Sequence, residues 1–124
     1  MEIPNTRPFF NDEDIDGILN DVGDSLKSGM LTLGPNIEKF ENQFAKYIGI
    51  KHAIALNSGT SALEVALRFF DVKDKEVIVP TNSFIASANA VMFAGGKPIF
   101  CDIKGETLCI DPDDLQKRIT PKTK

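Results

Sequence analysis

The sequence predicts an α/β protein made of parallel βαβ units, in which helices cover the faces of the sheet in an α/β/α arrangement. Short apolar runs alternate, after residue 50, with stretches whose apolar residues recur at helical spacing. Three such strand–helix pairs follow one another, and this succession produces a parallel sheet with helices packed against it. The chain of 124 residues is 42% hydrophobic and 26% charged, which is a normal globular balance.

Residues 1–50 precede this alternation, and we expect them to form an N-terminal helical segment. Apolar residues recur at helical spacing in two stretches, 12–28 and 36–48. Asn11 and Asp12 are candidate N-caps for the first stretch, and a glycine lies just past the end of each. The sequence therefore predicts two capped helices before the sheet begins.

Residues 51–124 are expected to be the first part of the α/β domain. The predicted strands are 52–56 (HAIAL), 76–80 (EVIVP) and 97–103 (KPIFCDI). The predicted helices are 60–70, with Leu63, Ala66, Leu67 and Phe70 facing inward, then 83–94, then 113–119 with Asp111 as its cap. The chain stops at TPKTK without a closing strand, so we expect it to be the truncated start of a longer domain.

Composition argues against several classes of function. The net charge is −4 and no run of Lys or Arg forms a basic stripe, so we expect no nucleic-acid partner. The N-terminus has no apolar segment typical of a signal peptide or membrane span, so we expect a cytoplasmic protein with no membrane partner. His52 is the only histidine, so we expect neither a metal site nor a Ser/His/Asp triad. Cys101 lies in an apolar run and is expected to be a small core residue.

The stretch NSGTS, residues 57–61, joins the first predicted strand to the first predicted helix of the sheet. Ligands of parallel α/β proteins bind beyond the carboxyl ends of strands, and a helix N-terminus offers unpaired N–H groups to an anion. Gly59 allows close approach, and Thr60 and Ser61 add hydroxyl donors, so these residues could cradle a phosphate. A plain capped helix, with Ser58 or Thr60 as the cap, explains the same letters about equally well.

Phe84 follows the second predicted strand, in the stretch VPTNSF. It could stack on a flat ring, although a core position is the more common fate of a phenylalanine. A phosphate cradle beside an aromatic platform suggests a phosphorylated aromatic cofactor, and both pyridoxal 5'-phosphate and flavin mononucleotide fit that description.

The chain resembles the N-terminal portion of the DegT/DnrJ/EryC1/StrS family of pyridoxal-phosphate-dependent sugar aminotransferases. The matching pieces occur in order along nearly the whole chain: SGMLTLGPNIEKFENQFAKYIGIKHAIALNSGTSALEVAL, EVIVPTNSFIASANAVMFAGGKPIFCDI and IDPDDLQKRITPKTK. The resemblance implies the start of the large α/β/α domain of a fold-type-I transferase. It also implies that Gly59, Thr60 and Ser61 bind the cofactor phosphate and that Phe84 packs on the pyridine ring, where many members have Tyr or Trp.

The family's Schiff-base lysine and its aspartate at the pyridine nitrogen are expected beyond the end of this chain. The resemblance therefore assigns no catalytic residue here, and we expect the 124 residues alone to be inactive. The full-length enzyme would move an amino group from an amino acid, with glutamate the expected donor, to a keto sugar nucleotide. The resemblance also implies a homodimer. The family's substrate mouth involves the segments RPFF and GMLTLG, to which we assign no residue.

Three alternatives stay open. Some members of the family replace the lysine with histidine and dehydrate sugars. The chain could also be a stand-alone, non-catalytic piece that binds a phosphate or a partner. A different fold-type-I enzyme, such as an aldolase or a desulfurase, would share the phosphate loop.

Overall fold

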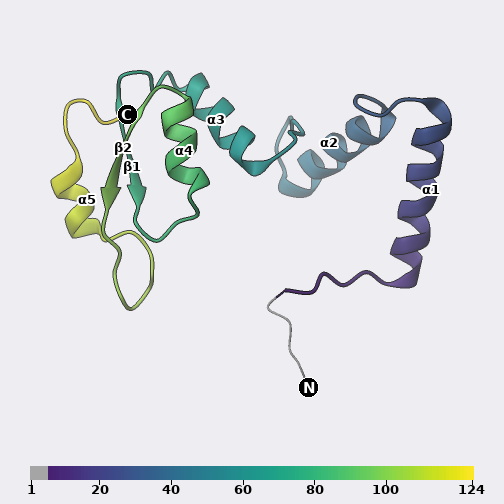
Figure 1. Ribbon diagram of the computed structural model, residues 1–124, viewed down its shortest axis with the longest axis horizontal. Helices are drawn as coiled ribbons and strands as arrows, with labels where there is room; N and C mark the ends of the chain where they lie inside the picture. The colour runs from purple at the N-terminus through teal and green to yellow at the C-terminus, as the bar shows by residue number, and fades with distance from the viewer. Residues whose placement is uncertain (1–5) are drawn as a thin grey trace. The chain divides into compact units, whose positions relative to one another are not determined.

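The computed structural model describes residues 6–124, and the chain divides into two compact units, Met1–Ala55 and Leu56–Lys124 (Figure 1). The first unit contains two helices, α1 (Asp12–Ser28) and α2 (Pro35–Ile48). The bounds predicted for α1 are confirmed. The second helix begins one residue earlier than predicted, because Pro35 occupies its first turn, where a missing N–H costs nothing.

Local caps define the helix ends in this unit. The Asn11 side chain accepts a hydrogen bond from the Asp14 backbone N–H at 2.7 Å, which confirms Asn11 as the cap of α1. Gly29 and Gly49 end α1 and α2 in the left-handed conformation, with φ angles of 72° and 78°. Both ends of α1 and the end of α2 are thus specified by residues within one turn of the helix end.

The apolar stripes of α1 and α2 lie largely at the surface of this unit. Ala45 is the one buried residue on the two helices. Leu19 and Leu26 of α1 are 63% and 65% exposed, and Phe40 of α2 is 56% exposed. Helical periodicity therefore predicted the helices correctly, but it did not predict burial within residues 6–55.

The strand predicted over residues 52–56 is absent. These residues adopt no regular secondary structure, and Ile54 is 80% exposed. The Ala55 N–H donates to the Glu41 side chain at 2.7 Å rather than to another strand. A strand needs a hydrogen-bonded neighbour, and within residues 6–124 no segment pairs with this one.

The second unit holds the sheet. In chain order it comprises α3 (Gly59–Phe69), β1 (Glu76–Pro80), α4 (Ala86–Phe93), β2 (Lys97–Cys101) and α5 (Pro112–Arg118). The two strands are parallel and in continuous register, with Glu76 opposite Lys97 and Pro80 opposite Cys101 (Figure 1). Helix α4 packs against both strands, and α5 packs against β2. The parallel βαβ unit predicted from the alternation is confirmed for β1, α4 and β2.

The last residues of the chain enter the sheet beside β1. The Glu76 N–H donates to the carbonyl of Lys122 at 3.0 Å, and the Lys124 N–H donates to the carbonyl of Glu76 at 2.9 Å. Both backbone groups of Glu76 face this segment, so Thr123 pairs with the edge of β1 opposite β2.

Four elements of this unit have bounds that differ from the prediction by one to three residues. Helix α4 begins at Ala86 instead of residue 83, because Phe84 and Ile85 form a turn in which the Ser87 N–H donates to the Phe84 carbonyl at 2.9 Å. Strand β2 ends at Cys101 instead of residue 103, where the chain turns into a loop closed by a bridge between Ile103 and Ile110. Helices α3 and α5 each lie one residue earlier than predicted.

Small side chains form the core of the second unit. The buried residues are Val72, Val79, Ala88, Ala90, Val91, Ala94 and Cys101. Cys101 is fully buried, which confirms it as a core residue. A Cβ on Gly96 would lie 3.1 Å from the carbonyl oxygen of Val72, so the close approach of these segments requires glycine there.

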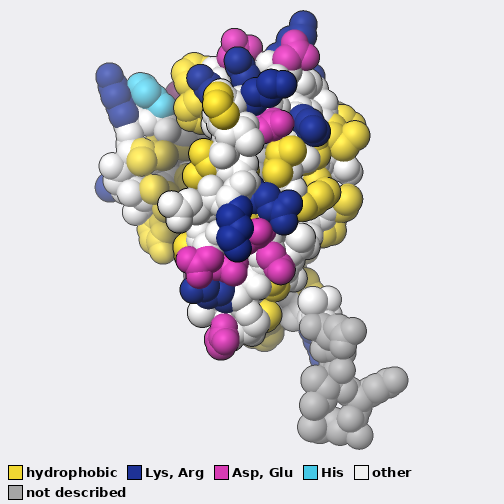
Figure 2. Space-filling view, turned by 90° about the vertical axis from the view of Figure 1, so that its left-hand side faces the viewer, with side chains coloured by type: hydrophobic (Ala, Val, Ile, Leu, Met, Phe, Trp, Pro, Cys, Tyr) yellow, Lys and Arg dark blue, Asp and Glu magenta, His cyan; other side chains and the backbone are white. Residues whose placement is uncertain are grey.

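The inward face predicted for α3 is wrong for the described residues. The helix has no buried side chain, and Leu63 and Phe70 are 44% and 61% exposed. Figure 2 likewise shows hydrophobic side chains at the surface of the second unit, between groups of both charges. Periodicity identified the apolar stripe of α3, but no described strand covers it.

Candidate cofactor-binding site

The start of α3 is an N-capped turn. Ser58 has an extended backbone, and its hydroxyl accepts a hydrogen bond from the Ser61 N–H at 3.1 Å. The hydroxyl oxygens of Ser58 and Ser61 are 3.0 Å apart. This is the capping arrangement that the plain-helix interpretation predicts, with Ser58 rather than Thr60 as the cap.

The cap leaves donors available for an anion. Within the described part of the chain, no protein atom accepts a hydrogen bond from the backbone N–H of Gly59 or Thr60. These two groups lie at the positive end of the α3 dipole, where phosphates bind. Because the Ser61 N–H is already bonded to Ser58, Ser61 offers its hydroxyl and not its backbone.

Gly59 keeps the approach to these donors open. A Cβ built on Gly59 meets no protein atom within 4 Å, and its backbone does not require glycine, since its φ angle is not in the left-handed region. Neither packing nor conformation in the described residues therefore demands glycine at this position. The open space beside Gly59 would allow close approach of a ligand.

Phe84 lies in the turn between β1 and α4. Its side chain is 78% exposed, so it is not part of the core formed by the second unit. The hydroxyls of Ser83 and Ser87 are 2.7 Å apart beside it. An exposed aromatic ring held at the start of a helix can provide a stacking surface.

The two candidate elements lie at one end of the second unit. Helices α3 and α4 pack against each other, and Arg68 near the end of α3 donates to the carbonyl of Phe93 at the end of α4. Beyond the helices, the Asp74 N–H donates to the Gly95 carbonyl at 2.9 Å. Because the two helices pack against each other and their C-terminal ends meet, we infer that they run in the same direction and that their N-termini lie at the same end of the unit.

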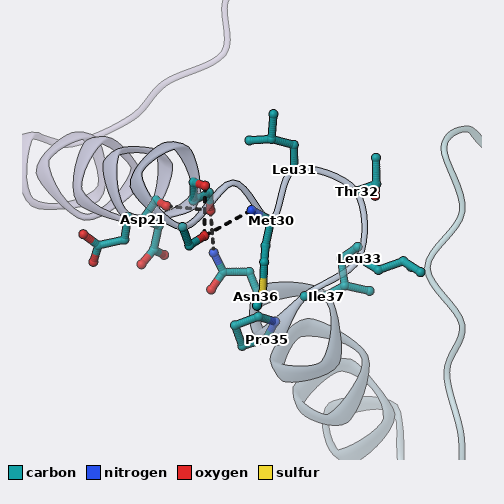
Figure 3. Close-up of a pocket in the computed structure, with 12 residues that line it drawn as sticks. Asp21, Met30, Leu31, Thr32, Leu33, Pro35, Asn36 and Ile37 are labelled. Carbon is teal, nitrogen blue, oxygen red and sulfur yellow. Dashed lines mark hydrogen bonds between the residues drawn. The ribbon is translucent and has the colours of Figure 1, made fainter.

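The first unit contains a separate cavity of about 540 Å³. It is lined by the end of α1, the connection over residues 29–34 and the start of α2 (Figure 3). The Asn36 amide donates to the Ser25 hydroxyl at 3.3 Å across its polar side, and Leu31 and Leu33 belong to its apolar side. The predicted cofactor residues are not among those that line it.

The described residues contain neither a candidate metal site nor a helix that could span a membrane. No group of three or more His, Cys, Asp or Glu side chains could hold a metal ion in residues 6–124. No helix in that range is long and apolar enough to cross a membrane.

Comparison with known protein families matches residues 12–124 to the DegT/DnrJ/EryC1/StrS aminotransferase family. The chain belongs to this family. Its curated relatives include the 3-oxo-glucose-6-phosphate:glutamate aminotransferase of Bacillus subtilis, at 42% identity over 98% of this chain and 28% of the relative. Another is the dTDP-4-dehydro-2,3,6-trideoxy-D-glucose 4-aminotransferase of Saccharopolyspora spinosa, at 36% identity over 95% of this chain and 30% of the relative.

Solved structures of family members have the same fold. Spr1654 from Streptococcus pneumoniae in its PLP form, for which a sugar aminotransferase activity is proposed, superposes with a TM-score of 0.90 at 34% identity, over 100% of this chain and 31% of that one. NtdA from Bacillus subtilis with bound PMP gives a TM-score of 0.82 at 36% identity, over 99% of this chain and 30% of that one. This family member thus spans about 30% of the length of its relatives.

Sequence reasoning named Gly59, Thr60, Ser61 and Phe84 as cofactor-binding residues of this family member. The structure places the first three in one turn and Phe84 at the same end of the unit. The sequence reasoning did not identify Arg68, which links the two helices, because a basic residue in the last turn of a helix is a common and unspecific pattern.

Proposed function

We propose that this chain is the cofactor-phosphate portion of a pyridoxal-phosphate-dependent aminotransferase. The full-length enzyme would transfer an amino group from an amino acid, with glutamate the expected donor, to a keto sugar nucleotide. The observation that supports this most directly is the pair of free N–H groups at Gly59 and Thr60, at the same end of the unit as the exposed ring of Phe84.

The residues present fit pyridoxal 5'-phosphate. Gly59 and Thr60 donate backbone N–H groups to the phosphate, and the Thr60 and Ser61 hydroxyls add further donors. Phe84 covers one face of the pyridine ring. When bound, this cofactor supplies an electron sink for the transfer of the amino group.

This chain's own residues hold the cofactor and do not move protons. The turn at Gly59 and Thr60 would hold the cofactor phosphate, and the α3 dipole would neutralise part of its charge. Phe84 would offer its ring for stacking and so help to orient the cofactor. We assign no catalytic residue within residues 6–124 and propose that the 124 residues alone are inactive.

The names of the relatives support the substrate class. One curated relative is a glutamate aminotransferase, and others act on dTDP- and GDP-linked sugars by name, including the GDP-perosamine synthase of Vibrio cholerae. We propose a sugar nucleotide as the acceptor. The homodimer and the cytoplasmic location stay predictions. The exposed apolar stripes of α1, α2 and α3 support burial against further protein.

A sugar dehydratase is the second candidate. The GDP-4-keto-6-deoxy-D-mannose-3-dehydratase of Escherichia coli, solved with hydrated PLP, superposes with a TM-score of 0.81 at 32% identity. That superposition covers 99% of this chain, so the described residues favour neither reaction over the other. A stand-alone, non-catalytic binding piece is the third candidate.

The test uses the protein expressed at its full natural length. Titration with pyridoxal 5'-phosphate should produce a saturable absorbance change in the visible range. The loaded protein, given glutamate and a panel of dTDP- and GDP-linked keto sugars, should release 2-oxoglutarate and an amino sugar. Loss of water from the sugar without release of 2-oxoglutarate would favour the dehydratase. Absence of cofactor binding would refute both enzymatic proposals and favour the non-catalytic one.

A further inference from the structure

Arg68 joins the C-terminal ends of the two helices that carry the two halves of the proposed cofactor site. Its guanidinium donates to the carbonyl of Phe93, the last residue of α4. Glu64, one turn earlier in α3, also contacts this guanidinium, with its carboxylate oxygen 2.9 Å from Nε and 2.8 Å from Nη2, the nitrogen that donates to Phe93. The carboxylate therefore aims the guanidinium at the neighbouring helix.

Helix α4 has few stabilising groups of its own. No side chain caps its N-terminus, and its last turn contains no basic residue to compensate the negative end of its dipole. The Arg68 cation supplies that charge from α3 and bonds one of the unpaired carbonyls.

Helix α3 depends on the same contact. It has no buried side chain, and among the described elements α4 is the one against which it packs extensively. The Arg68–Phe93 hydrogen bond is a polar link in that contact, and it opposes sliding of α3 along α4.

A short α-helix has a fixed rise of about 1.5 Å per residue. If α3 slides along α4 at the C-terminal ends, the N-terminal end of α3 therefore moves by the same distance. Gly59 and Thr60 begin α3, and Phe84 lies two residues before α4. The phosphate and the ring of pyridoxal 5'-phosphate are joined by covalent bonds and need a fixed separation between these sites. We propose that Arg68 is a positioning residue that fixes the separation of the phosphate cradle from Phe84. This inference rests on the proposed cofactor role.

The test compares variants of the full-length protein. Arg68→Met removes the hydrogen bond to Phe93 and keeps an apolar side chain of similar length. Glu64→Gln removes the negative charge that orients the Arg68 guanidinium. Arg68→Lys keeps a positive charge, but an ammonium group lacks the planar, forked donors that bond Glu64 and Phe93 together. Arg118→Met is the matched control, because Arg118 pairs with Asp114 four residues earlier in α5 and does not link α3 to α4. Each protein is titrated with pyridoxal 5'-phosphate, and its apo form is melted with and without inorganic phosphate.

Inorganic phosphate needs the α3 cradle alone, whereas the cofactor needs both sites at their correct separation. Arg68→Met should raise the cofactor dissociation constant by up to about tenfold, because the value of one hydrogen bond to a charged group is the upper limit of what this link can contribute to binding. The stabilisation of the apo form by phosphate should not change. Glu64→Gln should weaken cofactor binding in the same direction, Arg68→Lys should restore part of it, and Arg118→Met should have no effect.

Two results would overturn the inference. Equal loss of cofactor and inorganic phosphate binding in Arg68→Met would show that Arg68 maintains α3 rather than the separation. Unchanged cofactor affinity in Arg68→Met and Glu64→Gln, with only a lower melting temperature, would show a purely structural role. If Arg68→Met does not fold, the cofactor and phosphate binding of Glu64→Gln decides between these outcomes. Failure of the proposed function is distinct, because the unmutated protein would then not bind the cofactor.

Discussion

Substitution of Gly59 by valine separates the cofactor role of the α3 turn from its structural role. A Cβ at Gly59 meets no protein atom within 4 Å, and the backbone there is not left-handed. Valine is also a slightly better helix former than glycine, so the free energy of unfolding should change by no more than about 0.5 kcal/mol. The protein should therefore fold normally.

Cofactor binding should respond very differently. The added side chain occupies the space over the free N–H groups of Gly59 and Thr60, so the phosphate can no longer reach both. Loss of one hydrogen bond to a charged group costs about 1.5–3 kcal/mol. Since about 1.4 kcal/mol is a factor of ten, the dissociation constant should rise by about 10- to 100-fold.

Spectroscopic titration of the full-length protein with pyridoxal 5'-phosphate measures the effect, and thermal melting of the apo form measures stability. Gly17→Val is the matched control, because Gly17 lies within α1 and a Cβ there also meets nothing within 4 Å. This control should leave the dissociation constant unchanged. A folded Gly59→Val protein that binds the cofactor as tightly as the parent would refute the cradle.

Three further outcomes are expected. Phe84→Ala should loosen the cofactor with little change in melting temperature, since the ring is 78% exposed; unfolding of this variant would make Phe84 a core residue and end the stacking hypothesis. Ser58→Ala removes the cap of α3 and should lower the free energy of unfolding by about 1 kcal/mol, whereas an unchanged value in denaturant titration would contradict the capping role. The pKa of Asp114 lies below the ordinary value of an aspartate, 3.8, because its carboxylate accepts the Asp102 N–H and pairs with Arg118. The resulting stabilisation is present above that value and is lost as the pH falls through the lowered pKa, so Asp114→Asn should flatten the pH dependence of stability below about pH 4. An identical acid titration of stability in the variant would exclude this contribution.

Features governed by neighbouring residues could be predicted from the sequence. The ends of α1 were predicted correctly because Asn11 and Gly29 act on groups within three residues of themselves. The bounds of β1 and the parallel βαβ unit were also correct. The start of α4 was missed because Phe84 and Ile85 form a turn that the apolar run does not reveal.

Features that need a distant partner could not be predicted in the same way. Residues 52–56 have the composition of a strand, but a strand exists only with a neighbour, and none pairs with them in residues 6–124. The close contact at Gly96 depends on Val72, which the sequence gives no reason to place there. The apolar stripe of α3 was predicted to face inward, yet burial depends on what lies opposite it.

The sequence by itself determined the helix caps, the family-specific order of motifs, and the identity of Gly59, Thr60, Ser61 and Phe84 as candidate binding residues. These follow from local hydrogen bonding and residue chemistry, which act over one or two turns of chain. The tertiary structure alone decided that α3 and α4 run side by side with their N-termini together. The physical reason is that such packing, like the contact of Arg68 with Phe93 within it, joins residues 25 positions apart that meet only when the chain has folded.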